Sequence, residues 1–170
     1  MTELMHLPAV DYTKLMENDS NELKVLNNAA REYGFFRLHN VPALSEEVLR
    51  VTLQEIEGFF RLSLEEKMSM KRTEKNPFGY NDAEMTKQRK DWKEIYDIGP
   101  ERDSLSEETG TNQWPEDDKL PDFKLSMQNY FEVCSSVSLN LLGMLAKGLG
   151  ADVEACATVV ETYKNHTSYL

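Results

Sequence analysis

The sequence predicts a helix-rich α+β fold with a few short strands. Three stretches place apolar residues at helical spacing, and caps mark two further helices. Two shorter segments have the bulk or alternation of strands, and Gly and Pro separate several of these elements. With 170 residues, of which 40% are hydrophobic and 29% charged, the chain fits one folded domain or one lobe of a larger one.

The chain begins with an extended segment and a helix. Leu7–Asp11 reads as extended, and Pro8 favours an edge position. Asp19 and Glu22 have the spacing of a capping box, and Gly34 ends the helix that they begin. The stretch between Asp11 and Ser20 is polar, and the pattern indicates no helix in it.

A strand and two helices should follow. Phe35–Leu38 is bulky and short, which predicts a buried strand. Ser45 can cap a helix with one apolar face, and Ser63–Glu66 is a second capping box that starts a short helix. The apolar face expected to enter the core consists of Leu49, Leu53, Ile56 and Phe60.

The middle of the chain is predicted to contain two loops and one strand. Residues 71–91 are charged and carry a turn signal at Asn76–Tyr80, which indicates a loop. Trp92–Ile98 alternates and is predicted to be a strand. Residues 99–121 are acidic and rich in loop-forming residues, and Trp114 with Pro115 should pin this second loop to the body.

The last part is predicted to be mainly helical. A long helix is expected over residues 122–149, and Gly148 and Gly150 supply its stop. Asp152 should cap another helix that runs to about Val160, and Thr167–Leu170 resembles the start of a strand.

Charge and composition exclude several classes of partner. The formal net charge of -11 repels phosphate backbones and anionic lipid surfaces, so we expect neither nucleic acid nor membrane as partner. No apolar run reaches the length of a membrane span, and residues 1–11 lack the layout of a signal peptide. We therefore expect a cytoplasmic location, with Cys134 and Cys156 as free thiols.

Several short motifs occur in an order that resembles a known enzyme family. Leu7–Asp11 is similar to the pattern Ile-Pro-x-Ile-Asp, Ala29–Asn40 to Ala-x-x-x-x-Gly-Phe-Phe, and Phe59–Lys67 to Phe-Phe-x-Leu-Pro-x-Glu-Glu-Lys. The set as a whole resembles the non-haem iron(II) and 2-oxoglutarate-dependent dioxygenases of the isopenicillin N synthase-like group. The later landmarks are Gly79-Tyr80, Asp91–Glu94, Asn112–Pro115 and Leu142–Gly150. The chain departs from the family at His39-Asn40-Val41, where Asn-His-Gly is usual, and at Ser63, where proline is usual.

The resemblance implies a specific fold and chemistry. Residues 1–170 are expected to be the non-haem dioxygenase N-terminal domain, a helical lobe whose short strands would join a double-stranded β-helix, or jelly roll, that is largely absent from this chain. In the complete enzyme, iron(II) and 2-oxoglutarate would drive hydroxylation, desaturation or ring closure of a small organic molecule. The missing C-terminal catalytic domain is therefore the expected partner.

No metal site is predicted within the chain itself. The family's iron is held by two histidines and one carboxylate, and the sequence has no His-x-Asp or His-x-Glu. Its three histidines, His6, His39 and His166, are far apart in the sequence. His39 is expected to lie in a turn, and we predict that the chain binds no cofactor and is inactive alone.

Four aromatic residues are the candidates for substrate binding: Tyr80, Trp92, Phe78 and Tyr96. Aromatic walls with a few polar groups are typical of small-molecule pockets, and the resemblance implies that this region lies near the mouth of the substrate cavity. The alternative is that these rings only pack the lobe against the missing barrel. Arg89, Lys90 and Lys93 could attract an acidic substrate, or they could form an ordinary solvated face.

A second hypothesis comes from a different functional class. The same missing ligands, together with an intact helical pattern, are also compatible with a short non-catalytic product that binds or regulates a full-length homologue. A His-x-Asp and a later His encoded downstream of Leu170 would favour the fragment.

Overall fold

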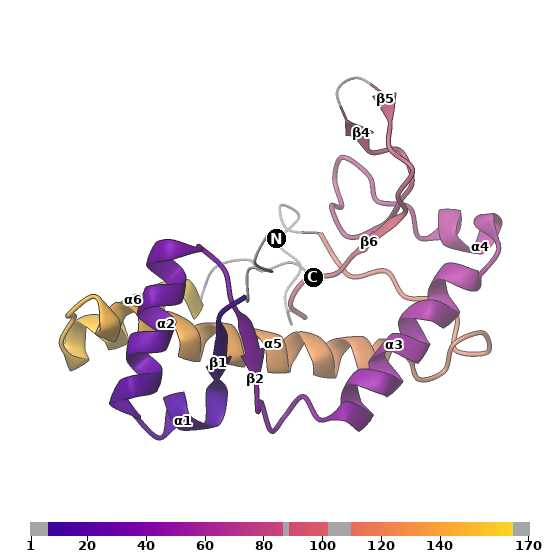
Figure 1. The fold of residues 1–170 in the computed structure, drawn as a ribbon. Helices are drawn as coiled ribbons and strands as arrows, with labels where there is room; N and C mark the ends of the chain where they lie inside the picture. The colour runs from indigo at the N-terminus through magenta and orange to yellow at the C-terminus, as the bar shows by residue number, and fades with distance from the viewer. Residues whose placement is uncertain (1–6, 87–88, 102–109, 165–170) are drawn as a thin grey trace, which may run out of the picture. The chain divides into compact units, whose positions relative to one another are not determined.

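The computed structural model describes residues 7–86, 89–101 and 110–164 (Figure 1). They belong to two compact units. Among the described residues, the terminal unit comprises 7–45 and 135–164, and the central unit comprises 46–86, 89–101 and 110–134. The expected fold class is confirmed, because helices predominate among the described residues, the strands have two or three residues each, and no closed barrel forms within the described ranges.

The terminal unit begins with a short parallel strand pair beside two helices. β1 (Ala9–Asp11) pairs with β2 (Arg37–His39), and α1 (Tyr12–Met16) and α2 (Ser20–Glu32) lie between them in the sequence (Figure 1). The polar stretch after Asp11 therefore contains a helix, α1, that the sequence pattern did not indicate. Its cap explains this, because the Asp11 carboxylate accepts a hydrogen bond from the Lys14 backbone N–H at 3.2 Å.

The cap of α2 is confirmed, but its second half differs from the expected capping box. The Asp19 carboxylate accepts from the backbone N–H groups of Asn21 and Glu22, at 2.7 and 3.0 Å. The Glu22 side chain instead accepts from the backbone N–H of Asp11, at 2.7 Å. Glu22 thus ties α2 to the end of β1, a contact that only the tertiary structure creates.

The strand expected at residues 35–38 begins later and is less buried than predicted. β2 starts at Arg37, and Phe35 before it is 53% exposed. The core of the terminal unit lies on the other strand, where Val10 is fully buried. It packs with Leu15 and Leu26 of α1 and α2 and with three residues from the second half of α5 (Phe123–Gly148), namely Leu141, Met144 and Leu145.

The helix pair that closes the terminal unit matches the sequence pattern. α5 covers nearly all of the predicted range 122–149, and Gly150 after it has the positive φ of +91° that glycine tolerates. Asp152 caps α6 (Val153–Lys164) by accepting from the Ala155 N–H at 2.8 Å. α6 runs four residues beyond the expected end at Val160. The strand start expected at residues 167–170 lies outside the described residues.

The central unit begins with α3 (Glu46–Arg61) and α4 (Leu64–Ser69), and the face of α3 differs from the prediction. The buried residues of α3 are Thr52 and Phe59, whereas Leu53 of the predicted face is 58% exposed. The reason is aromatic packing, because the Phe59 ring stacks on Phe123 of α5 with centroids 5.2 Å apart. The buried stripe is thus rotated, and Leu49 and Phe60 also stay more than one third exposed.

α4 begins with the predicted capping box. The Ser63 hydroxyl accepts from the Glu66 N–H at 3.2 Å, and the Glu66 carboxylate accepts from the Ser63 N–H at 2.8 Å. The serine that replaces the family's usual proline therefore supplies a functioning cap.

The segment expected to be a loop at residues 71–91 contains three short strands. β3 (Gly79–Asn81) pairs antiparallel with β6 (Ile95–Asp97), and β4 (Met85–Thr86) pairs with β5 (Arg89–Lys90). Polar composition hid these strands. β3 finds its partner, β6, in a later part of the chain, so the local pattern carried no signal.

The core of the central unit joins α3, β3, β6 and α5. It consists of buried residues from α3, β3 and α5 and from the positions just after α4 and β6, with the half-buried Tyr96 of β6 and Trp114 packed against it. Trp114 contacts Phe123 edge to face at 6.2 Å, which confirms that it pins the second loop. The buried residues are Phe59, Met70, Tyr80, Ile98, Phe123, Met127 and Phe131.

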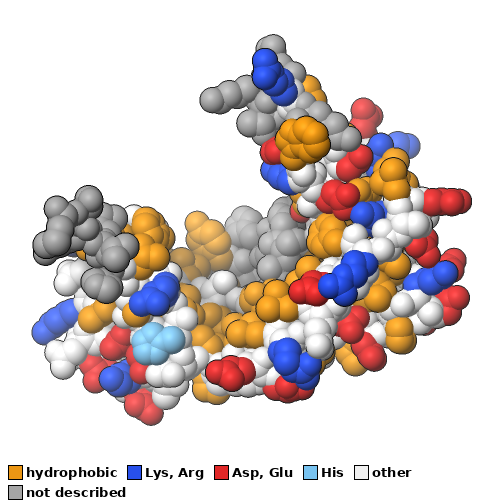
Figure 2. Space-filling model, turned by 45° about the vertical axis from the view of Figure 1, so that its right-hand side comes forward, with side chains coloured by type: hydrophobic (Ala, Val, Ile, Leu, Met, Phe, Trp, Pro, Cys, Tyr) orange, Lys and Arg blue, Asp and Glu red, His pale blue; other side chains and the backbone are white. Residues whose placement is uncertain are grey.

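Two further sequence expectations can be compared with the described residues. Cys134 and Cys156 are free and half-buried. Among the helices of the described ranges, none combines the length and apolarity needed to cross a bilayer. The face in Figure 2 shows acidic and basic side chains interspersed with exposed hydrophobic ones.

Candidate functional site

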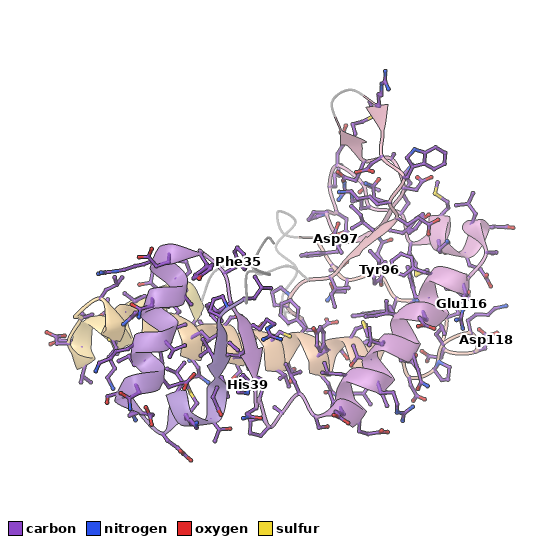
Figure 3. The ribbon with its side chains drawn as sticks, viewed as in Figure 1. Phe35, His39, Tyr96, Asp97, Glu116 and Asp118 are labelled. Atoms are coloured by element: carbon purple, nitrogen blue, oxygen red, sulfur yellow. The ribbon has the colours of Figure 1, made fainter. Side chains whose placement is uncertain are left out.

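The strand pair β3–β6 brings two of the four candidate aromatic residues together. Tyr80 lies directly opposite Tyr96 in the antiparallel register, and Figure 3 labels Tyr96 and Asp97 side by side on β6. Tyr80 has no exposed surface, and Phe78 just before β3 is 3% exposed. The Phe78 ring fills the space beside Gly99, where a Cβ would come within 2.3 Å of it. Three of the four candidates thus lie in or against the core.

The fourth candidate, Trp92, is fully exposed and lies outside a strand. The predicted strand over residues 92–98 is wrong in extent, because β6 begins only at Ile95. Glu94 lies outside the pairing of β3 with β6, and its carboxylate contacts Lys67 of α4. The indole of Trp92 therefore stands in solvent on an irregular segment, Asp91–Glu94.

A pocket of about 310 Å³ lies along this segment. It is lined by Trp92, by three carboxylates and by one ammonium group: Asp82, Asp91, Glu94 and Lys93. The Lys93 ammonium is 3.9 Å from the Asp91 carboxylate. An excess of carboxylates does not suit an acidic substrate, so this lining gives no support to the hypothesis that Arg89, Lys90 and Lys93 attract one.

The pocket residue Glu94 forms an ion pair with a buried lysine. The side chain of Lys67, on α4, is 7% exposed, and its ammonium is 2.6 Å from the Glu94 carboxylate. The same ammonium lies 5.5 Å from the centre of the Tyr80 ring, a cation–π distance. Lysine is rarely buried without a partner, so this pair is a specific tertiary contact.

The Tyr80 hydroxyl is an orphaned polar group beside this pair. Within the described part of the chain it is buried and has no hydrogen-bond partner of acceptable geometry. Burial raises the pKa of Tyr80, and the nearby charges of Glu94 and Asp82 raise it further. The hydroxyl is therefore neutral at physiological pH and stands close to carboxylates.

The Tyr96 hydroxyl, unlike that of Tyr80, has a hydrogen-bond partner. Its hydroxyl donates to the backbone carbonyl of Gln113, and burial raises its pKa far above the ordinary value for tyrosine. Its ring packs on Phe59 with centroids 4.2 Å apart. Tyr96 thus connects β6 to the loop that carries Trp114.

The loop that carries Trp114 is held by side-chain amides that imitate a strand. The Asn112 amide both donates to the Gly99 carbonyl and accepts from the Gly99 N–H, each at 2.8 Å. The Gln113 amide donates to the Phe78 carbonyl at 2.7 Å. These contacts give a structural reason for the landmark Asn112–Pro115, and they close the strand pair on the side of Gly79.

Another ionic cluster fixes the other face of β6. The Arg72 guanidinium contacts the Asp97 carboxylate at 2.9 Å and also bonds to Glu84. Glu84 accepts in addition from the Asn81 amide at 2.9 Å. Residues such as Lys67 and Arg72 were not among the sequence candidates, because a charge in a polar stretch looks solvated until its distant partner is known.

The described residues do not fit an iron site. Among them, no three His, Cys, Asp or Glu side chains come together to hold a metal ion. His39 lies at the end of β2 rather than in the expected turn, paired in register with Asp11 (Figure 3). The Asp11 carboxylate accepts from the Asn40 amide at 2.7 Å, and this bond is the main cause that lowers its pKa. His6 and His166 lie outside the described residues.

Comparisons with known proteins place these features in context. A family profile described as non-haem dioxygenase in morphine synthesis, N-terminal, matches residues 7–117. S-norcoclaurine synthase 1 of Coptis japonica is 27% identical over 170 residues, covering 98% of this chain and 47% of that protein. The chain spans about half the length of the curated relatives that it matches.

Solved structures show the same architecture. A full-length Neurospora crassa protein, solved in complex with alpha-KG, superposes with a TM-score of 0.74 at 26% identity, covering 89% of this chain and 50% of that one. JOX2 in complex with 2OG, Fe and JA gives a TM-score of 0.76 over 96% of this chain and 46% of that one, at 18% identity, which is a likeness of fold.

Proposed function

This chain belongs to the non-haem iron(II) and 2-oxoglutarate-dependent dioxygenases and corresponds to their N-terminal portion; from this we propose that residues 1–170 form the N-terminal domain of an oxygenase that oxidises a small organic molecule. The observation that carries the proposal is the family match over residues 7–117. In the proposed complete enzyme, iron and 2-oxoglutarate would be held by the catalytic domain, since the described residues of this chain do not fit an iron site.

The first role that we propose for the domain is to support the jelly roll. Exposed apolar side chains favour this role, because a surface of that kind is typical of an interface. On α3 and the start of α4 the most exposed are Leu53 and Leu64, each at 58%, and on α5 it is Leu125 at 61%. The isolated chain should therefore self-associate, and light scattering can test this.

The second role is to form one wall of the substrate cavity, and the burial pattern assigns the four candidates different parts in it. We propose that Trp92 contacts substrate, because it is the candidate with a free surface and it lines a pocket. Tyr80 and Phe78 would hold the strand pair beneath it, since buried rings cannot reach a ligand without a rearrangement of the core. The half-buried Tyr96 would do so through its hydroxyl, which donates to the Gln113 carbonyl.

A substitution in the complete enzyme tests this second role. Trp92→Ala should weaken substrate binding while the melting temperature stays within about 2 °C, because an exposed side chain contributes little to stability. Substrate-stimulated release of succinate from 2-oxoglutarate, over a panel of small organic molecules, gives the affinity. Val153→Ala, an exposed apolar residue of α6 outside the proposed interface and pocket, is the control. A large fall in melting temperature with unchanged affinity would contradict the proposal.

A direct assay tests the proposed inactivity of the chain alone. The purified chain is incubated with iron(II), ascorbate and 2-oxoglutarate, and succinate is measured against a metal-free control. We expect no difference between the two. Succinate above the control, or iron held in a 1:1 ratio after gel filtration, would refute the assignment of catalysis to another domain.

A further inference from the structure

The segment that carries Trp92 is not held by regular secondary structure. Asp91–Glu94 has no helix or strand assignment, so its position depends on individual contacts. At its start, the Asp91 N–H donates to the Glu84 carbonyl at 2.8 Å. At its end, the Glu94 carboxylate meets Lys67 at 2.6 Å. Trp92 lies between these two anchor points.

Lys67 is well suited to be the fixed end of the second anchor. It lies in α4, whose first turn is locked by the capping box, and its ammonium also donates to the Phe60 carbonyl at 3.3 Å. Its side chain is 7% exposed, whereas that of Glu94 is 41% exposed. The pair therefore joins a rigid, buried cation to a carboxylate on a segment that would otherwise face water.

Stability alone does not explain a lysine at this position. An ion pair whose cation is buried is often no more stabilising than an apolar residue of similar volume, because the buried ammonium of Lys67 loses its hydration. What such a pair does provide is a single defined geometry, since its strength depends on distance and direction. The value of Lys67 thus lies in where it holds Glu94.

We propose that Lys67 is a positioning residue that fixes the Asp91–Glu94 segment, and with it the Trp92 indole, against the substrate cavity. The inference rests on the proposed function of Trp92. Lys67 itself would not touch substrate, because its side chain is buried behind the segment.

Backbone dynamics of the chain test the proposal directly. In ¹⁵N-labelled protein the amides of Trp92 and Lys93 should have order parameters of about 0.85, as in rigid backbone, and Lys67→Met should lower them below about 0.6. The melting temperature of Lys67→Met should stay within about 3 °C of wild type, because methionine fills the buried site and Glu94 can hydrate. Arg61→Met, which removes the exposed Arg61–Glu57 pair of α3, is the matched control and should leave the amides rigid.

Exchanging the two charges tests whether the Lys67–Glu94 pair itself orders the segment. The charge-exchanged variant Lys67→Glu/Glu94→Lys should regain most of the order, and a variant that stays as mobile as Lys67→Met would overturn the pair's role. Unchanged amides in Lys67→Met would also overturn it. If Lys67→Met does not fold, Lys67→Gln takes its place, and loosening of the whole central unit rather than of residues 91–94 would show a merely structural role.

The outcomes separate this inference from the proposed function. Loss of order in Lys67→Met, combined with unchanged substrate affinity in Trp92→Ala, would leave the positioning intact and refute the substrate wall. Weakened affinity in Trp92→Ala, combined with an ordered segment in Lys67→Met, would do the reverse. If both hold, Lys67→Met in the complete enzyme should raise KM at least threefold with a smaller change in kcat.

Discussion

Two tyrosines that face each other across β3 and β6 should respond oppositely to loss of the hydroxyl. Tyr80→Phe removes a buried oxygen that has no hydrogen-bond partner among the described residues. Such a group costs about 1–3 kcal/mol, and the carboxylates beside it offset part of this, so we expect a gain of about 1 kcal/mol. The ring remains, and so does its packing.

Tyr96→Phe provides the matched comparison. Its hydroxyl donates to the Gln113 carbonyl, which would lose its partner in a half-buried site. We expect a loss of about 1–2 kcal/mol, the usual cost of such a deletion. The two variants share the same chemistry and strand pair, so a general effect of Tyr→Phe cannot produce opposite signs.

The assay is urea unfolding followed by the fluorescence of Trp114. This indole packs on Phe123 in the core of the central unit, so it reports the unit that contains both tyrosines. For a chain of this size 1 kcal/mol corresponds to about 2–4 °C in melting temperature, which calorimetry can resolve. If Tyr80→Phe is destabilised to the same extent as Tyr96→Phe, the Tyr80 hydroxyl has a stabilising partner and the reasoning is refuted.

Three other predictions concern the glycines, the caps and alkaline pH. Gly79→Ala should cost more than about 3 kcal/mol or prevent folding, because its Cβ would lie 2.2 Å from a backbone carbonyl oxygen, whereas Gly34→Ala, with open space around it, should cost only about 1 kcal/mol; urea midpoints compare them. Ser63→Ala should cost about 1 kcal/mol by loss of the capping box, and an unchanged midpoint would contradict the assigned cap. Folding raises the pKa values of Tyr80 and Tyr96, so their contribution to the free energy of unfolding is complete below pH 10.0 and is lost as the pH rises above it. The melting temperature should therefore fall above pH 10.0, and it should fall less steeply in Tyr96→Phe.

Local signals in the sequence were sufficient for helix ends. Asp19, Ser63 and Asp152 each cap the helix predicted from them, because a cap acts on N–H groups two or three residues away. The long helix was also predicted nearly to its ends. In these cases the interaction that fixes the structure lies within a few residues of the signal.

Burial was predicted less well, because several faces of a helix can satisfy the same spacing. In α3 the expected face contained Leu53, yet aromatic packing turned Phe59 inward. Likewise, Trp92–Ile98 has the alternation of a strand, but β6 begins only at Ile95, and the Glu94 side chain pairs with Lys67. Among the four candidate residues, exposure separates Trp92 from the three rings that lie in or against the core.

The sequence by itself determined the family, the helix-rich class and the caps, because ordered motifs and short-range hydrogen bonds are written in neighbouring residues. Only the tertiary structure decided which aromatic ring is exposed and which charges are buried. Lys67 and Glu94 are 27 residues apart in the sequence, and Arg72 and Asp97 are 25 residues apart. Such pairs form only when packing brings distant segments together. A charge acquires its role from the partner and the dielectric around it, and neither is encoded locally.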